Sequence, residues 1–204
     1  MRVWLARHGE TLWNRERRVQ GVTDVPLSDL GRRQAALLGD LLSGARPEAV
    51  YCSPLSRARD TGRAVAARHG LELRIRPGLQ ELNQGVLEGK TFAEMVAGHG
   101  DLVREWWRDP GDQRLPGGES MMELQARAWA VLDEIRTGPE REVVVVSHNM
   151  TIRAILARAL EQSLAHVRRF RLSPASLCRI AWSGAPWPQV ELVGYDDHTR
   201  GAEA

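Results

Sequence analysis

Lysine is almost absent from this 204-residue chain, because Lys90 is its only lysine and arginine carries nearly all of the positive charge. The net charge is only +2, and no basic run is interleaved with aromatic side chains, so the sequence argues against nucleic-acid binding. Cysteine is scarce too. Cys52 and Cys178 form no CxxC pair and are too few for a disulfide framework, so both are expected to be reduced, buried thiols.

Long apolar runs are also missing. No stretch approaches the length needed to span a bilayer, and the apolar stretch at the N-terminus is too short for a signal peptide. We therefore expect a cytoplasmic protein with no membrane partner. The hydrophobic fraction of 43% and the charged fraction of 26% are ordinary for a globular chain, and the length fits a single domain over 1–204.

Short apolar runs alternate with amphipathic stretches along most of the chain. Strands are expected at 2–6, 49–52, 71–75 and 143–146, with a final hairpin at 177–182 and 189–193. Helices are expected at 28–42, 56–68, 120–136 and 150–160. Two shorter helices and a Pro/Gly-rich stretch make 91–118 a variable, lid-like insertion. The pattern predicts a three-layer α/β/α sandwich with a mostly parallel central sheet and an antiparallel C-terminal edge.

Three of the predicted strands end in polar residues that suit one kind of chemistry. Arg7 and His8 follow the first strand, Arg57 lies just beyond the second, and His148 follows the run of four valines. Functional groups of such sheets gather beyond the carboxyl ends of the strands. We therefore expect these four side chains in one cleft.

Phosphoryl transfer is the chemistry that this set favours. Arginine forks neutralise the equatorial oxygens of a phosphate ester, and a neutral imidazole is a nucleophile without a repelling charge. A protonated His148 would donate to a phosphate oxygen. The leaving group needs a proton, and Glu81, just after the third strand, is the preferred donor, with Glu10 and Glu88 as alternatives.

The segment Leu5–Thr11, which reads LARHGET, resembles the signature of the histidine phosphatase superfamily, also called the phosphoglycerate-mutase-like family. The similarity extends over most of the chain, through Asn14, Asp24–Ser28, Ser53–Ala58, Glu81–Gly89, Pro116–Ser120 and Val146–His148. One departure is Asn149-Met150, which stands where many relatives have a glycine pair, and it is expected to alter the floor of the pocket without displacing His148.

This resemblance implies an α/β/α sandwich and a two-step reaction that needs no metal and no other cofactor. His8 matches the histidine that becomes phosphorylated, and Glu81 matches the general acid that later deprotonates the attacking water. The rest of the phosphate pocket would consist of Arg7, Arg57 and His148, with Asn14, Gln20, Gly21 and Asn149 at its edge.

The expected activity is hydrolysis of a small phosphorylated metabolite. A phosphoglycerate mutase, which keeps the phosphoryl group for transfer, and a non-catalytic phosphate-binding module on the same fold are the alternatives. A metal hydrolase is disfavoured because the chain has no HExxH motif. The substrate and the oligomeric state stay open.

Two further groups of residues have more than one interpretation. Trp106 and Trp107 are expected to pack against the domain or to line a lid, with lining of the pocket as the less favoured alternative. Arg15, Arg17 and Arg18 would either reach an anionic substrate or form a solvated cluster.

Overall fold

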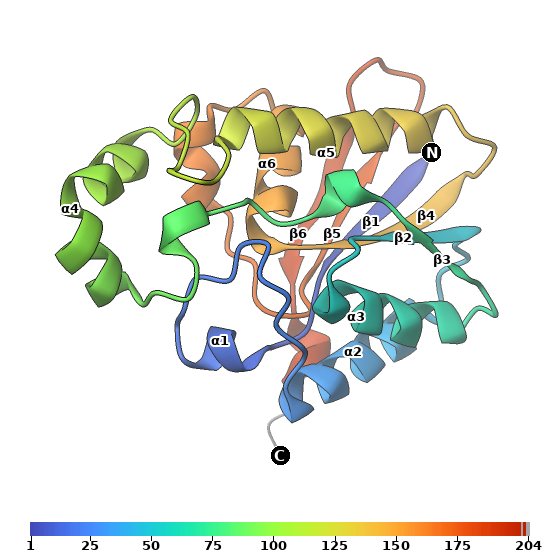
Figure 1. Cartoon of the computed structure of the whole chain (residues 1–204). Coiled ribbons are helices and arrows are strands. Elements are labelled where there is room, and N and C mark those ends of the chain that lie inside the picture. Colours follow the sequence, from blue (N-terminus) through green and yellow to red (C-terminus); the bar gives the residue numbers. More distant parts are fainter. Residues whose placement is uncertain (201, 203–204) are drawn as a thin grey trace.

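The computed structural model describes residues 1–200 and 202, and a single six-stranded sheet forms its centre (Figure 1). The strand order is β3-β2-β4-β1-β5-β6. The strands are β1 (Arg2–Arg7), β2 (Ala49–Cys52), β3 (Leu73–Ile75), β4 (Glu142–Ser147), β5 (Leu177–Ala181) and β6 (Gln189–Tyr195). β1 to β4 are mutually parallel, whereas β5 runs antiparallel to both β1 and β6. The predicted α/β class and its antiparallel C-terminal hairpin are confirmed.

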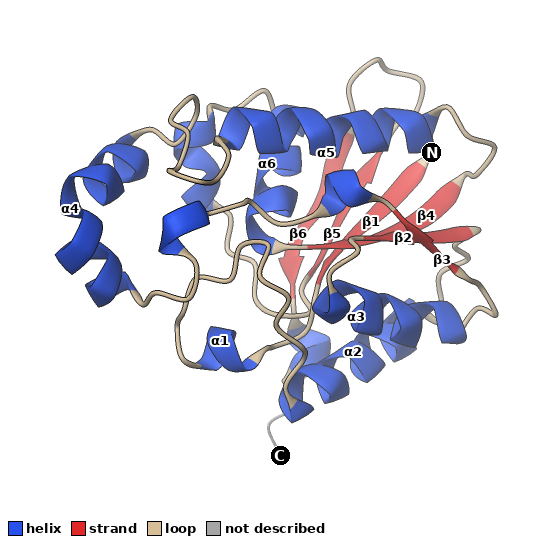
Figure 2. Ribbon diagram, in the orientation of Figure 1, coloured by secondary structure: helices blue, strands red, loops and turns tan. Residues whose placement is uncertain are grey.

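Helices cover both faces of this sheet (Figure 2). Their bounds are α1 (Leu12–Arg15), α2 (Asp29–Leu42), α3 (Ser56–Ala67), α4 (Phe92–Arg108), α5 (Met121–Arg136) and α6 (Asn149–Ala159). Short 3-10 turns lie at Pro77–Leu79, Gly85–Leu87, Leu164–Arg169 and Asp197–Thr199. The sheet thus forms the middle layer of three.

The valines of β4 show why the sheet must be covered twice. Val143 and Val145 pack with side chains of α5 and α6, whereas Val144 and Val146 pack with side chains of α2 and α3. All four are buried. Successive side chains of a strand point to opposite faces, so an uninterrupted apolar run requires a helical layer on each side.

The predicted helix starts depend on serine caps, and the structure contains them. The hydroxyls of Ser28 and Ser120 accept from the backbone N–H groups of Gly31 and Glu123, at 3.0 and 3.2 Å. The third strand is shorter than expected. Leu71 still donates its N–H to the carbonyl of Ala66, so it belongs to the closing turn of α3 rather than to β3.

The segment between β3 and α5 builds a side wall instead of covering the sheet. α4 extends away from the sheet (Figure 1), and its backbone is non-helical at His99, which agrees with the two short helices expected there. Its buried residues Met95, Val103 and Trp106 pack with side chains of α5 and α6. That the segment acts as a lid stays a prediction. No helix of the described residues is long and apolar enough to cross a bilayer.

Candidate active site

A cavity of about 480 Å³ opens at the carboxyl ends of β1 and β4, between α1, α4 and α6. Of the predicted site residues, it is lined by Arg7, His8, Asn14, Gln20, Gly21, Arg57, Glu81 and Asn149. Residues that lie up to 142 positions apart, from Arg7 to Asn149, therefore share one cavity, as expected for residues that follow the carboxyl ends of parallel strands. His148 is close by but does not line the cavity.

His8 is buried and holds one fixed tautomer. Its Nδ1 lies 2.7 Å from the carbonyl oxygen of Gly9. A carbonyl only accepts, so Nδ1 carries the proton and Nε2 keeps its lone pair. Burial, followed by the nearby charges of Arg57 and Arg7, holds the pKa of His8 well below its usual value. The ring is therefore neutral at neutral pH.

Two arginines present positive charge beside this ring. Arg57 is fully buried and donates to the carbonyls of Gly21 and Thr23 at 2.7 and 2.8 Å, while Arg7 donates to the carbonyl of Leu172 at 2.5 Å. Burial lowers the pKa of Arg7 to about 10, and burial also lowers that of Arg57. Both remain cations at neutral pH, and neither forms an ion pair with a described residue. The pair is suited to an anion held against His8.

The backbone approach of α2 fixes the loop that carries His8. Gly31, in the first turn of α2, lies so close to this loop that an added Cβ would stand 1.9 Å from the carbonyl oxygen of Glu10. An added Cβ at Gly9 would stand 2.4 Å from the carbonyl oxygen of Gly31. Glycine at both positions is therefore a packing requirement.

His148 lies beside His8, with the two ring centroids 5.1 Å apart. It is fully buried, and its Nε2 is 2.8 Å from the Ser53 hydroxyl. Burial is the main cause that holds its pKa well below the usual value, and Arg57 adds to the effect. The ring is thus neutral in this structure, rather than the protonated donor considered from sequence. A neutral imidazole still offers one N–H.

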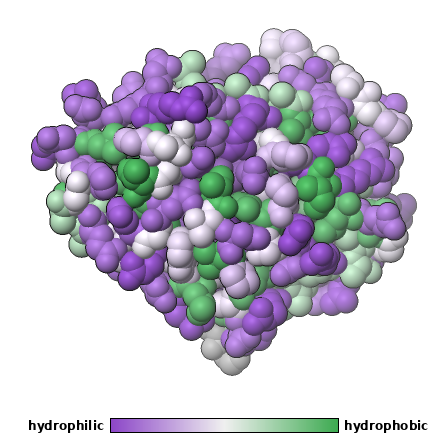
Figure 3. Space-filling view, in the orientation of Figure 1, coloured by the Kyte–Doolittle hydropathy of each residue, from purple (hydrophilic) through white to green (hydrophobic). Residues whose placement is uncertain are grey.

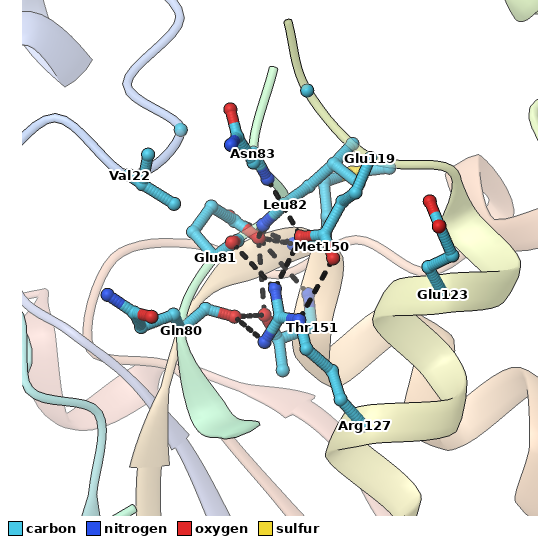
Figure 4. A network of polar contacts seen from close by, with 12 residues as sticks. Val22, Gln80, Glu81, Leu82, Asn83, Glu119, Glu123, Arg127, Met150 and Thr151 are labelled. Carbon is cyan, nitrogen blue, oxygen red and sulfur yellow. Dashed lines mark hydrogen bonds and ion pairs between the residues drawn. The ribbon is translucent and has the colours of Figure 1, made fainter. Parts of the chain in front are cut away.

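Glu81 is the one acidic side chain among the described residues that line the cavity. Its carboxylate sits against the first turn of α6 and accepts from the backbone N–H groups of Met150 and Thr151 at 3.1 and 3.2 Å (Figure 4). The N–H of Leu82 donates to it as well, at 2.9 Å. Backbone donors at a helix N-terminus orient a carboxylate firmly.

Arg127 of α5 holds the backbone on which Glu81 is mounted (Figure 4). Its guanidinium donates to the carbonyls of Gly78 and Gln80, both at 2.8 Å, and to the carbonyl of Glu81 at 2.9 Å. It also pairs with the Glu119 carboxylate at 2.6 Å. Neither Arg127 nor Glu119 was expected from the sequence to support the site.

The two alternative acids are occupied elsewhere. Glu10 accepts from Arg15 and from the Ser28 hydroxyl, at 3.0 and 2.7 Å. Glu88 accepts from the backbone N–H groups of Val22 and Thr23, both at 2.9 Å. Neither lines the cavity, so the preference for Glu81 agrees with the geometry.

Sequence reasoning gave no role to two arginines that line the outer wall of the cavity, Arg153 and Arg168. Both tryptophans of α4 line the same wall, as the pocket-lining interpretation of Trp106 and Trp107 predicts. The Arg168 guanidinium stacks over the Trp107 ring, 4.1 Å from its centroid. Arg153 stands one helical turn after Asn149, and this spacing is the signal that would have placed it on the same face of α6.

The three arginines at the end of α1 and just after it differ in whether they face the cavity or form ion pairs at the surface. Arg17 and Arg18 line the cavity, whereas Arg15 does not and instead forms an ion pair with Glu10 at 3.0 Å. Arg18 also pairs with Glu16 and Glu94, at 3.0 and 3.1 Å. Its charge is therefore largely compensated within the chain.

Comparison with known proteins agrees with this geometry. Residues 3–193 match the histidine phosphatase superfamily (branch 1). A probable phosphoglycerate mutase of Yersinia pestis, GpmB, is 35% identical over 188 residues, which cover 92% of this chain and 87% of that protein. The solved structure of a mycobacterial glucosyl-3-phosphoglycerate phosphatase in complex with VO3 is 30% identical with a TM-score of 0.85, covering 95% of this chain and 98% of the other. YhfR of Bacillus stearothermophilus is 29% identical with a TM-score of 0.87, covering 97% and 98%.

Proposed function

We propose that this chain, which belongs to branch 1 of the histidine phosphatase superfamily, hydrolyses a small phosphate monoester through a phosphohistidine on His8. The observation that carries the proposal is the state of His8. It is a neutral ring with Nδ1 fixed by the Gly9 carbonyl, and it shares a cavity with two buried arginines that pair with no acidic side chain of the described residues. A nucleophile beside unpaired cations is what a phosphate dianion requires.

In the first step, Nε2 of His8 attacks the phosphorus as the bond between phosphorus and the ester oxygen breaks. Arg7 and Arg57 bind the equatorial oxygens, where charge is spread in the transition state. Glu81 donates a proton to the departing oxygen, so that an alcohol leaves instead of an alkoxide. The N–H of neutral His148 stabilises the phosphoryl group from beside His8.

In the second step, water attacks the phosphohistidine and the bond between phosphorus and Nε2 breaks. Glu81, now ionised, accepts the proton of the water, which returns the site to its starting state. Asn14, Gln20, Gly21 and Asn149 form the polar edge of the pocket that orients the phosphoryl group. Inorganic phosphate then departs.

The phosphatase is proposed to need no metal, because Arg7 and Arg57 supply the positive charge at the phosphate. Its proposed location is the cytoplasm. A phosphoglycerate mutase remains the second candidate, since the relative GpmB carries that name. The two activities share the first step and differ in whether water or a second substrate takes the phosphoryl group.

The decisive experiment measures p-nitrophenyl phosphate hydrolysis in the presence of EDTA for the wild type and for His8→Ala. Loss of the nucleophile should lower kcat by at least about a thousandfold. Rapid alkaline quench with a substrate labelled in its phosphate group should trap a label on the wild type alone, and subsequent acid treatment should release it.

His69→Ala is the matched control, because His69 follows α3 and does not line the cavity. It should retain full activity and labelling. Retention of turnover by His8→Ala would exclude the proposed intermediate. A labelled wild type that releases no phosphate to water, yet interconverts phosphoglycerates, would assign the mutase activity instead.

A further inference from the structure

Arg153 stands out among the buried and partly buried arginines of the cavity, because its guanidinium has no oxygen partner among the described residues. Its Nη1 contacts the Met150 sulfur at 3.9 Å, and its Nε, like those of Arg7 and Arg57, is buried without a partner among the described residues. Arg153 forms no ion pair with any described residue. A sulfur at this distance is a weak acceptor, so no direct contact compensates the cation.

Of the other arginines of the cavity, Arg17 is exposed to water, and the rest have partners. Arg7 and Arg57 donate to backbone carbonyls, and Arg18 pairs with two glutamates. Arg168 donates to the carbonyls of Trp106 and Trp107 and stacks on both rings. A partly buried charge without a partner is costly, and such charges are normally paired. The unpaired state of Arg153 is therefore a feature that a bound anion would relieve.

The position of Arg153 separates it from the transferred phosphate. It lies four residues after Asn149 on α6, which is just over one turn, or about 6 Å, along the helix axis. Behind burial as the main cause, its charge contributes to the lowered pKa of Arg7 on one side and of Arg168 on the other. It thus stands between the phosphate pocket and the tryptophan wall of α4.

The charge balance of the cavity leads to the same conclusion. Arg7 and Arg57 suffice for one phosphate dianion, and Glu81 is the one acid in the described lining. Of the remaining cavity arginines, Arg17 is exposed and Arg18 and Arg168 have partners, so Arg153 is the partly buried cation that the phosphoryl group does not need. One extra anionic group on the substrate, about a helical turn from the phosphorus, would compensate it.

We infer that Arg153 binds a second anionic group of the substrate, so that the preferred substrates are phosphate monoesters that also carry a carboxylate or another phosphate. This inference rests on the proposed hydrolase function and names the class of ester that the same site selects. Trp106 and Trp107 of α4 then lie beside the carbon skeleton that connects the two anions.

The test uses two pairs of substrates that differ in the second anion. Glycerol 3-phosphate is compared with 3-phosphoglycerate for a carboxylate, and fructose 6-phosphate with fructose 1,6-bisphosphate for a phosphate. The wild type should favour the doubly anionic member of at least one pair by about tenfold or more in kcat/KM, the scale of one charge-assisted contact. Arg153→Leu should abolish that preference, mainly through KM, and Arg153→Lys should restore part of it.

Arg158→Leu is the matched control, because Arg158 lies on the same helix, stacks over Trp129 and does not line the cavity. It should leave the preference unchanged. Absence of a preference in the wild type, or an equal loss for both members of a pair in Arg153→Leu, would overturn the inference.

Failure of the proposed function is recognised separately. An inactive wild type on p-nitrophenyl phosphate would end the hydrolase proposal, and calorimetric binding of the same substrate pairs would still decide the role of Arg153. Tighter binding of the doubly anionic member that Arg153→Leu removes would support the role. Equal binding of both members would refute it.

Discussion

Replacing Arg127 by leucine should weaken both the fold and the proposed proton transfer, because this side chain ties α5 to the segment that carries Glu81. The guanidinium loses contacts to three carbonyls, of Gly78, Gln80 and Glu81, and the two oxygens of Glu119 lose their ion pair. The Arg127 side chain is 27% exposed and that of Glu119 14% exposed, so water replaces the lost contacts only in part.

Removing one partner of a buried pair costs about 3–5 kcal/mol, and exposed pairs contribute less than about 1 kcal/mol. The intermediate exposure places Arg127→Leu near 3 kcal/mol in the free energy of unfolding, or about 6–12 °C in Tm for a chain of this size. Urea unfolding measures the first quantity and calorimetry the second. Arg136→Leu, on the same helix with an exposed ion pair to Asp133 at 3.6 Å, should cost no more than about 0.5 kcal/mol.

A catalytic measurement then separates positioning of Glu81 from general stability. The p-nitrophenolate ion is a good leaving group and departs with little help from an acid. An alcohol is a poor leaving group and needs a proton as it departs. Arg127→Leu should therefore lower kcat for glycerol 3-phosphate about tenfold more than kcat for p-nitrophenyl phosphate, since a well-placed general acid contributes about 100-fold or more. Glu81→Gln should show the same selectivity more strongly. Equal losses on both substrates would refute the positioning role.

Two other predictions concern the histidines and the loop after β1. Burial lowers the pKa values of His8 and His148 in the folded state, so the unfolded chain binds more protons than the folded chain below about pH 6.5. As the pH decreases below this value, the free energy of unfolding should decrease by up to about 1.4 kcal/mol per pH unit for each ring. Urea unfolding at pH 7 and pH 5 measures this slope, and a His148→Gln slope equal to that of the wild type would contradict the neutral state of His148, because the variant should have the smaller slope. Gly31→Ala should destabilise the fold by about 1–3 kcal/mol and impair turnover, because its Cβ would meet the Glu10 carbonyl at 1.9 Å. Gly44→Ala, whose Cβ would meet nothing within 4 Å, is the control, and equal stability of the two variants would contradict the packing argument.

The parts of the site that could be predicted are those fixed by strand ends. His8 follows β1 and Arg57 follows β2, so recognising the two apolar runs was enough to place both side chains at one edge of the sheet. The serine caps at Ser28 and Ser120 worked for a similar reason, because capping depends on residues within one turn. Local signals and one topological rule were sufficient there.

Other features depend on contacts that no local pattern encodes. α1 is a single turn without apolar periodicity, closed by Thr11 and Asn14, so no helix was expected there. The pairing of Arg127 with Glu119 and with the carbonyls near Glu81 depends on how α5 lies over a distant loop. His148 lies beside His8 as the strand-end rule predicts, whereas its contact with the Ser53 hydroxyl depends on a neighbour 95 positions away.

The residues proposed to act on phosphorus and the residues that line the outer wall of the cavity come largely from different elements. The residues proposed to act on phosphorus come from β1, α3, β4 and the loop after β3, which are fixed by the central sheet. Arg168 and the tryptophans come from a 3-10 turn and α4, which pack in an apolar cluster beside the sheet, and Arg153 comes from α6, which packs both in this cluster and on the sheet. Figure 3 shows apolar atoms at the surface where α4 lies, and Phe92, Val96 and Trp107 of this helix are exposed. None of the groups that shift the pKa of His8 lies on α4, so we expect substitutions in α4 to change KM and the order of substrate preference while the pH dependence set by His8 is retained.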